Sequence, residues 1–308
     1  MNFQSMNYFI MVARQKSFTK AAENLHITQQ TLSVHIASLE KELKCKLFIR
    51  HVPLVLTYGG EVFLQYAVEL QKKYQALQHE FADIAHNENG QLRIGVGYTR
   101  GRAIMPDLIE AFQKQYPNIE IQIKENANDA LQKSLLAGEI DLAIANFPAK
   151  IPGVTLYDFY EEEIILLLAD KLVKTIYGSA AKQILDQVQE RRSLAGLKAC
   201  PFMLNSEQDI AGRIGRTILA KAHFRPLLKV QSGSVQTLLS LCLKGVAACF
   251  CQKNLALATL SQEQLQNLHM IGLDKSASYM IRFGVAEHSY QWKMIRSFMQ
   301  IAWQQQGS

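Results

Sequence analysis

The sequence has 308 residues, of which 48% are hydrophobic and 19% charged, and its net charge at pH 7 is +6. Two domains are expected at this length. The chain has no apolar run near the roughly 18 residues of a membrane span and no secretory signal, which excludes membrane proteins and exported proteins. We therefore expect a cytoplasmic protein with no membrane partner, and the seven basic against three acidic side chains in its first 60 residues suit a phosphate backbone.

Three short helices are predicted at the N-terminus. In the first, Met6, Phe9, Ile10 and Ala13 recur at helical spacing and form one apolar face. A shorter helix follows, and Thr28 supplies the N-cap of a third helix that turns its apolar residues inward and leaves a small, polar outer face. Two short helices joined by a tight connection are typical of a helix-turn-helix.

Residues 47–57 predict a short two-stranded wing, which completes a winged helix-turn-helix domain over 1–58. A long linker helix over 59–89 follows, and its apolar residues alternate by four and three, as in a coiled coil. We expect these residues to form a seam with a second copy of the chain; the alternative is that the helix packs on its own domain. The seam residues are Phe63, Leu70, Tyr74, Leu77, Phe81 and Ile84.

Beyond residue 90, short apolar strands alternate with helices, which predicts parallel sheets with helices on both faces. The first series has strands at 92–96, 119–124 and 141–145 and helices at 104–116 and 128–137. The second has strands at 163–168, 201–204, 228–231 and 246–250 and helices near 182–191, 208–222 and 235–243. We expect a two-lobed α/β sensor domain over 90–308, similar to periplasmic binding proteins, with lobe I at about 90–161 and 268–308 and lobe II at about 162–267.

The N-terminal segment from Phe9 to Arg50 resembles the LysR-type transcriptional regulators. The likeness includes Ser17-Phe18-Thr19, the Thr28-Gln29 start of the third helix and Leu47-Phe48 before the wing. Further along, LRIGVG, YPNIEI, GEIDLAI and VAACF also resemble that family, so the likeness covers nearly the whole chain. Agreement between this string, the heptad helix and the split α/β domain makes the resemblance specific.

The resemblance implies a transcription regulator that binds double-stranded DNA and responds to a small-molecule effector. It implies a homodimer or homotetramer joined through the linker helices, with RNA polymerase as a further partner. A two-fold coiled coil places two recognition helices on successive major grooves, so the operator should be pseudo-palindromic.

Seven residues are candidates for DNA contact. Gln29, Gln30 and Ser33 begin the recognition helix, where amide side chains can pair with adenine edges. Thr19, Thr28 and Arg50 fall where the family meets phosphates, although both threonines also fit as helix caps. Val34 is the seventh candidate. Val34 and its neighbour His35 stand where members of the family commonly carry basic or amide groups, so we expect a different base preference. The wing has fewer cations than usual, so we also expect weaker phosphate binding.

The effector cleft of such a domain lies between the lobes, at the carboxyl ends of strands and the amino ends of helices. Helix N-termini near an arginine favour an anionic or carboxylate effector, although Arg100 and Arg102 could also be a solvated surface pair. The candidate effector residues are Tyr98, Thr99, Arg100, Phe147, Asn205, Ser206, Ser232, Gly233, Ser234 and Cys249.

Other classes of function have less support. No catalytic motif, phosphate loop or metal-ligand spacing is present in the sequence, so we expect no enzyme, no cofactor and no metal site. A free small-molecule binding protein would lack the first 90 residues. A thiol-based redox regulator of the same fold would need two exposed cysteines close together, whereas reduced, buried thiols are the expected state of Cys45, Cys200, Cys242, Cys249 and Cys251.

Overall fold

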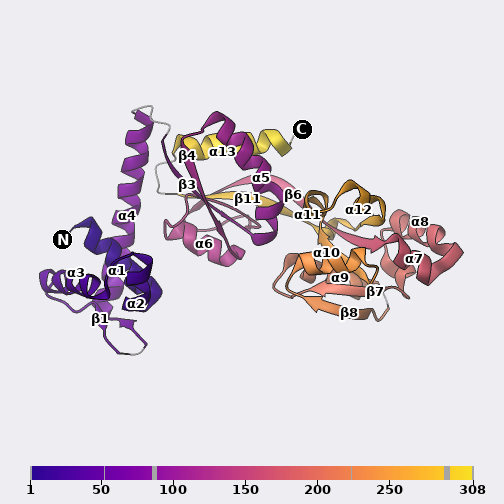
Figure 1. The fold of residues 1–308 in the computed structure, drawn as a ribbon, viewed down its shortest axis with the longest axis horizontal. Coiled ribbons are helices and arrows are strands. Elements are labelled where there is room, and N and C mark those ends of the chain that lie inside the picture. Colours follow the sequence, from indigo (N-terminus) through magenta and orange to yellow (C-terminus); the bar gives the residue numbers. More distant parts are fainter. Residues whose placement is uncertain (1, 52, 85–88, 223, 288–291, 307–308) are drawn as a thin grey trace.

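The computed structural model describes residues 2–51, 53–84, 89–222, 224–287 and 292–306. Figure 1 shows three parts: an N-terminal domain, a long helix α4, and a C-terminal region whose two lobes extend away from that helix. Among the described residues, no helix is long and apolar enough to cross a membrane.

The N-terminal domain folds around three helices and a small hairpin. Its elements are α1 (Phe3–Gln15), α2 (Phe18–Asn24), α3 (Gln29–Glu42), β1 (Phe48–Ile49) and β2 (Val55–Leu56). Each helix begins at a polar cap: the side chains of Asn2, Ser17 and Thr28 accept hydrogen bonds from backbone N–H groups of the first turn. The predicted apolar faces of α1 and α3 meet in one buried core, and β1 pairs antiparallel with β2 to form the expected wing.

Helix α4 (Tyr58–Ile84) begins against this domain and continues alongside the first lobe (Figure 1). Ala67 is fully buried in the N-terminal core. Farther along, Arg14 of α1 pairs with Glu139 at 3.2 Å, Lys72 donates a hydrogen bond to a first-lobe carbonyl, and His79 stacks on the buried Trp292 with ring centroids 4.5 Å apart. The N-terminal domain is therefore attached to lobe I.

Lobe I is a five-stranded sheet in the order β4-β3-β5-β11-β6, in which β3 is parallel to β4 and β5 and β11 is antiparallel to β5 and β6. Its elements are β3 (Gly90–Val96), α5 (Tyr98–Gln115), β4 (Ile119–Glu125), α6 (Asn128–Leu136), β5 (Leu142–Ala145), β11 (Ser278–Ala286) and α13 (Lys293–Gln306). Helix α5 begins six residues earlier than the predicted 104–116.

Lobe II is built on the far half of β6, which pairs with β9 and β10, and continues through β7 to the edge strand β8. Its elements are β6 (Val154–Ala169), α7 (Asp170–Tyr177), α8 (Ala181–Arg191), β7 (Pro201–Asn205), α9 (Ile210–Lys221), β8 (Leu227–Ser232), α10 (Val235–Leu243), β9 (Ala248–Gln252), α11 (Lys253–Thr259), α12 (Gln262–Gln266) and β10 (Leu268–Gly272). Short 3₁₀ turns at Gly178–Ala180, Leu194–Leu197 and Lys275–Ala277 join some of these elements.

Strand β6 joins the two lobes, which corrects the predicted boundary. Residues 154–163 pair with β11 in lobe I, whereas residues 164–169 pair with β9 or β10 in lobe II. The predicted strand at 163–168 is therefore the second half of a 16-residue crossover. Strand β10 also belongs to lobe II, so the return to lobe I falls between Gly272 and Ser278 rather than at 268.

Candidate DNA-binding surface and effector cleft

The N-terminus of α3 presents a polar surface to solvent. Gln29, Gln30 and Val34 are exposed, and Ser33 is half-buried beside them. The Thr19 hydroxyl of α2 donates to Gln29 Oε1 at 3.5 Å, which is at the limit of hydrogen-bond distance and brings two of the predicted contacts together. This surface is free to enter a groove without rearranging the core.

The two threonines differ in their structural role. Thr28 is the N-cap of α3, since its hydroxyl accepts from the backbone N–H of Thr31 at 3.1 Å. In α2 the cap is Ser17 rather than Thr19. Thr19 thus stays exposed and is not needed as a cap, whereas a phosphate contact by Thr28 would come in addition to its structural role.

Glu40 at the end of α3 anchors the wing. Its side chain is only 2% exposed, and Oε1 accepts from the backbone N–H of Leu47 at 2.9 Å. Oε2 pairs with Lys46 at 2.9 Å and with Arg50 at 3.6 Å. Burial alone would raise the pKa of this carboxyl, but the hydrogen bonds from Leu47 and Lys46 outweigh it and lower the pKa below its ordinary value.

Arg50 is held in place by two contacts. It pairs with Glu40, and its guanidinium lies over the ring of Phe18, 5.4 Å from the centroid. The arginine nevertheless remains exposed. The wing can therefore present one oriented cation to a phosphate.

His35 lies on the side of α3 that faces α1. Its Nδ1 is 3.3 Å from the hydroxyl of Ser5, and its ring makes an edge contact with Tyr8, with centroids 4.9 Å apart. The expected effect of His35 on base preference is therefore corrected: this side chain packs on α1. Val34, which is 64% exposed, is the one of these two departures from the family pattern that lies on the surface.

The predicted seam on α4 divides into two parts. Phe63 packs against Phe9 of the N-terminal core, with ring centroids 4.9 Å apart, so it is corrected from a seam residue to a core contact. The next four predicted residues are exposed by 39 to 62% and follow one face of the helix. These four are Leu70, Tyr74, Leu77 and Phe81. The side chain of Ile84 lies outside the described residues.

A cavity of about 220 Å³ opens between the lobes at the predicted helix and strand ends. Three of the predicted residues line it from lobe I: Tyr98, Thr99 and Arg100. Its other lining residues are Gly97, Asn126, Ala127, Asn128, Gln208, Asp209, Ile210, Gln252 and Tyr279. The cavity therefore draws on both lobes, as a ligand cleft between two domains does.

Arg100 is buried at the side of this cavity, only 7% exposed, so it is not a solvated surface residue. Its Nη1 lies 3.5 Å from the Ile144 carbonyl. Nearby, the Tyr160 hydroxyl donates to Glu162 Oε2 at 3.0 Å. Burial raises the pKa of the Glu162 carboxyl, although the positive charge of Arg100 opposes that shift. A buried cation and a buried carboxylate thus lie together near the crossover strand.

Other predicted effector residues do not line this cavity. Phe147 is 2% exposed and packs in the core beside α6, and Cys249 is fully buried in the core of lobe II. Asn205 is also buried, and its amide donates to Asp209 Oδ1 at 3.0 Å, so it helps to orient the side chain of Asp209, which lines the cavity. The lining set contains none of the four remaining candidates, which are Ser206, Ser232, Gly233 and Ser234.

Sequence reasoning missed nine of the twelve residues that line the cavity. Asn126 and Asn128 follow the second strand, which was predicted, so the rule about strand ends would have found them. Asp209 could have been found as the cap of the following helix. Gln252 is the last residue of β9, two residues beyond the predicted end of that strand. Tyr279 belongs to β11, which the alternation of strands and helices did not indicate.

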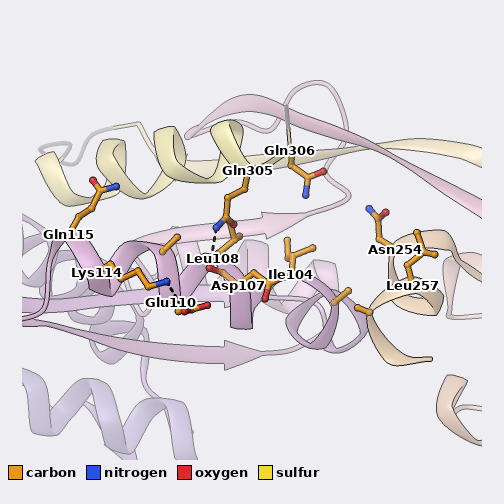
Figure 2. A pocket seen from close by; sticks show the side chains of 13 residues that line it. Ile104, Asp107, Leu108, Glu110, Lys114, Gln115, Asn254, Leu257, Gln305 and Gln306 are labelled. Carbon is orange, nitrogen blue, oxygen red and sulfur yellow. Dashed lines mark hydrogen bonds and ion pairs between the residues drawn. The ribbon is translucent and has the colours of Figure 1, made fainter. Parts of the chain in front are cut away.

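A larger groove of about 810 Å³ lies outside the cleft, between α5, α11 and the C-terminal end of α13. Figure 2 shows Asn254 and Leu257 facing Gln305 and Gln306 across it. Its wall also carries the exposed ion pair between Glu110 and Lys114. The groove is open and has few converging buried polar groups, so the smaller cavity is the better candidate for a ligand site.

Four of the five cysteines are buried in lobe II, and only Cys45 is exposed. Burial raises the pKa of the Cys200 thiol to about 12 and also raises that of Cys251. Contact with Cys242, followed by burial, raises the pKa of Cys249. Among the described residues, no group of three or more His, Cys, Asp and Glu side chains is placed to hold a metal ion.

We expect a disulfide reagent to modify one thiol per native chain rapidly, because a reactive thiol must be both exposed and ionised. Absorbance of the released chromophore should report about one fast thiol in the native protein and all five after unfolding. Cys45→Ser should remove the fast phase. Two or more fast thiols in the native protein would instead support the redox alternative.

An exposed recognition helix with an anchored wing, a linker helix and a two-lobed ligand cleft define an effector-controlled DNA-binding transcription regulator. Residues 3–61 match the family described as bacterial regulatory helix-turn-helix protein, lysR family, and residues 85–306 match the LysR substrate binding domain. The chain belongs to the LysR family of transcriptional regulators.

Named relatives agree with this assignment. The chain is 31% identical over 218 residues to the HTH-type transcriptional regulator YtlI of Bacillus subtilis, covering 70% of this chain and 69% of that protein. It is 28% identical over 253 residues to the uncharacterized regulator YcgK of the same organism, covering 80% and 78%.

Solved structures share the fold over the full length. A full-length OxyR variant from Pseudomonas aeruginosa superposes with a TM-score of 0.69 at 20% identity, covering 98% of this chain and 93% of that one. CbnR in complex with its target DNA gives a TM-score of 0.60 at 20% identity, covering 98% and 99%.

Proposed function

We propose that this regulator reads a pseudo-palindromic operator with the N-terminus of α3. The observation that carries the proposal is the free surface formed by Gln29, Gln30 and Val34, with Ser33 at its edge. The amides of Gln29 and Gln30 have the donor and acceptor pair that recognises adenine in the major groove. Thr19, Thr28 and Arg50 surround this surface and are suited to phosphate contacts that set its position.

We propose that the protein acts as a homodimer or homotetramer through α4. Leu70, Tyr74, Leu77 and Phe81 form an apolar face at heptad spacing that a second copy would cover. Such a pairing places two recognition helices on one face of DNA. The regulator would act in the cytoplasm, without catalysis, by changing the access or activity of RNA polymerase.

We propose that the cavity between the lobes binds the effector. Tyr98, Thr99 and Arg100 line it at the start of α5, where free N–H groups and the guanidinium favour a carboxylate or another anion. Closure of the two lobes on the ligand would then change the arrangement of subunits on the operator. The position of Arg100 beside the N-terminus of α5 supports the anionic effector expected from the sequence.

The DNA proposal is tested by a mobility shift with the DNA that flanks the protein's own gene. Gln29→Ala should weaken specific binding about tenfold or more, since one amide-to-adenine pair is worth roughly 1–3 kcal/mol. Gln183→Ala is the matched control, because Gln183 is also exposed but lies on α8 of lobe II. Affinity should fall as salt rises. Binding that is nonspecific and unchanged by Gln29→Ala would contradict the proposal.

A further inference from the structure

The lobe I wall of the cleft presents two helix N-termini to the same cavity. The N-cap residues of α5 and α6, Gly97 and Ala127, both line it. Neither helix has a side chain that caps its first N–H groups. Uncapped N–H groups and the helix dipole make this wall attractive to a carboxylate.

The lobe II wall has the opposite character. The N-terminus of α9 is already capped, because Asp209 Oδ1 accepts from the backbone N–H groups of Ala211 at 2.8 Å and Gly212 at 3.2 Å. Asp209 is half-buried and lines the cavity, and the described residues give its side chain hydrogen bonds from Asn205, Ala211 and Gly212 but no salt-bridge partner. Its carboxylate therefore offers a fixed negative charge across from the two uncapped helices.

Buried polar atoms between these walls lack partners in the protein. Gln252 is 5% exposed, and its Oε1 has no hydrogen bond within the described structure. Arg100 is 7% exposed, and its Nε likewise has none. Both residues line the cavity. An unpaired buried polar group is costly unless something else satisfies it, so these two atoms indicate a polar ligand.

We propose that the effector is a zwitterion of the α-amino acid class. Its carboxylate would lie at the N-termini of α5 and α6 near Arg100, and its ammonium group would pair with Asp209. A plain anion would leave Asp209 without a cation and would place two negative charges near each other in a closed cleft. The cavity of about 220 Å³ suits a molecule of amino-acid size. This inference rests on the proposed function of the cleft.

The test measures thermal stability and titration calorimetry of the full-length protein with each of the twenty proteinogenic amino acids. For any amino acid that binds, the matched deaminated acid and decarboxylated amine are measured as well. At least one amino acid should raise the melting temperature, and both matched compounds should bind at least tenfold more weakly. A panel in which no amino acid binds would overturn the proposal.

Asp209→Asn supplies the second arm, because asparagine also caps a helix and so preserves the fold. This variant should lose at least tenfold in affinity for the amino acid. Glu207→Gln is the control, since Glu207 is two residues away and does not line the cavity. Equal binding of the deaminated acid, unaffected by Asp209→Asn, would overturn the zwitterion while leaving the cleft as an anion site. Operator binding in the same preparations shows separately whether the proposed function holds.

Discussion

Replacing Leu70 and Leu77 together with aspartate is expected to convert the protein to monomers and to weaken operator binding by more than a hundredfold. Both side chains lie on the exposed apolar face of α4. In a dimer they would be buried against a second copy, so each substitution would place a charge in a desolvated seam. Sedimentation should show the loss of the dimer, and a mobility shift should show the loss of affinity.

The control for this prediction is Gln78→Asp, which adds a charge next to Leu77 at another exposed position of the same helix. It should leave both the oligomeric state and the operator affinity unchanged. If the double variant stayed dimeric, the seam would have to lie elsewhere on the chain. Circular dichroism distinguishes a folded monomer from an unfolded one.

Glu40→Ala is expected to destabilise the DNA-binding domain by about 2 kcal/mol, because it leaves a buried backbone donor unsatisfied, while the exposed cations Lys46 and Arg50 can return to water. The Leu47 N–H would lose its acceptor, and Lys46 and Arg50 would lose their counter-charge. Hydrogen exchange of the full-length protein should accelerate across residues 44–57, and operator affinity should fall. Glu23→Ala, at an exposed position on α2, is the control and should change neither.

The Glu40 carboxyl also makes the stability of the DNA-binding domain depend on pH. Because the pKa of Glu40 is lowered in the folded protein, its contribution to stability is present above the pKa of the unfolded chain and is lost as pH falls through the folded value. Wing stability should therefore decrease on the acid side of pH 4.5. Glu40→Gln, which keeps an acceptor for Leu47 but no charge, should show a smaller dependence. An equal pH dependence of stability in the wild-type protein and in Glu40→Gln would show that the Glu40 charge does not stabilise the wing.

The N-terminal elements could be predicted because their signals are local. Caps such as Thr28 and apolar residues at helical spacing in α1 and α3 specify a helix within one or two turns. The seam was harder, since spacing alone does not say where α4 leaves its own domain. Phe63 has the periodicity of Leu70, yet only the folded core shows that Phe63 contacts Phe9.

The cleft could be predicted only in part, because it combines segments that are far apart in the chain. The rule that ligands bind at strand ends identified Tyr98 to Arg100, which begin α5 one residue after β3. Gln252 and Tyr279 reach the cavity through β9 and β11, and the position of β11 depends on long-range antiparallel pairing with β5 and β6. Burial also overturned one expected ligand contact: Cys249 lies in the last predicted strand, but its side chain is buried in the core of lobe II.

The separation between the core of the N-terminal domain and the outer surface of α3 has a consequence for how such regulators diverge. Leu32 and Ile36 hold the helix to its domain, and Glu40 fixes the wing from the same helix. Gln29, Gln30 and Val34 point to solvent, where substitutions usually change stability by no more than about 0.5 kcal/mol. Under the proposed mode of DNA reading, evolution can redirect the scaffold to a new operator through these positions with little loss of folding stability.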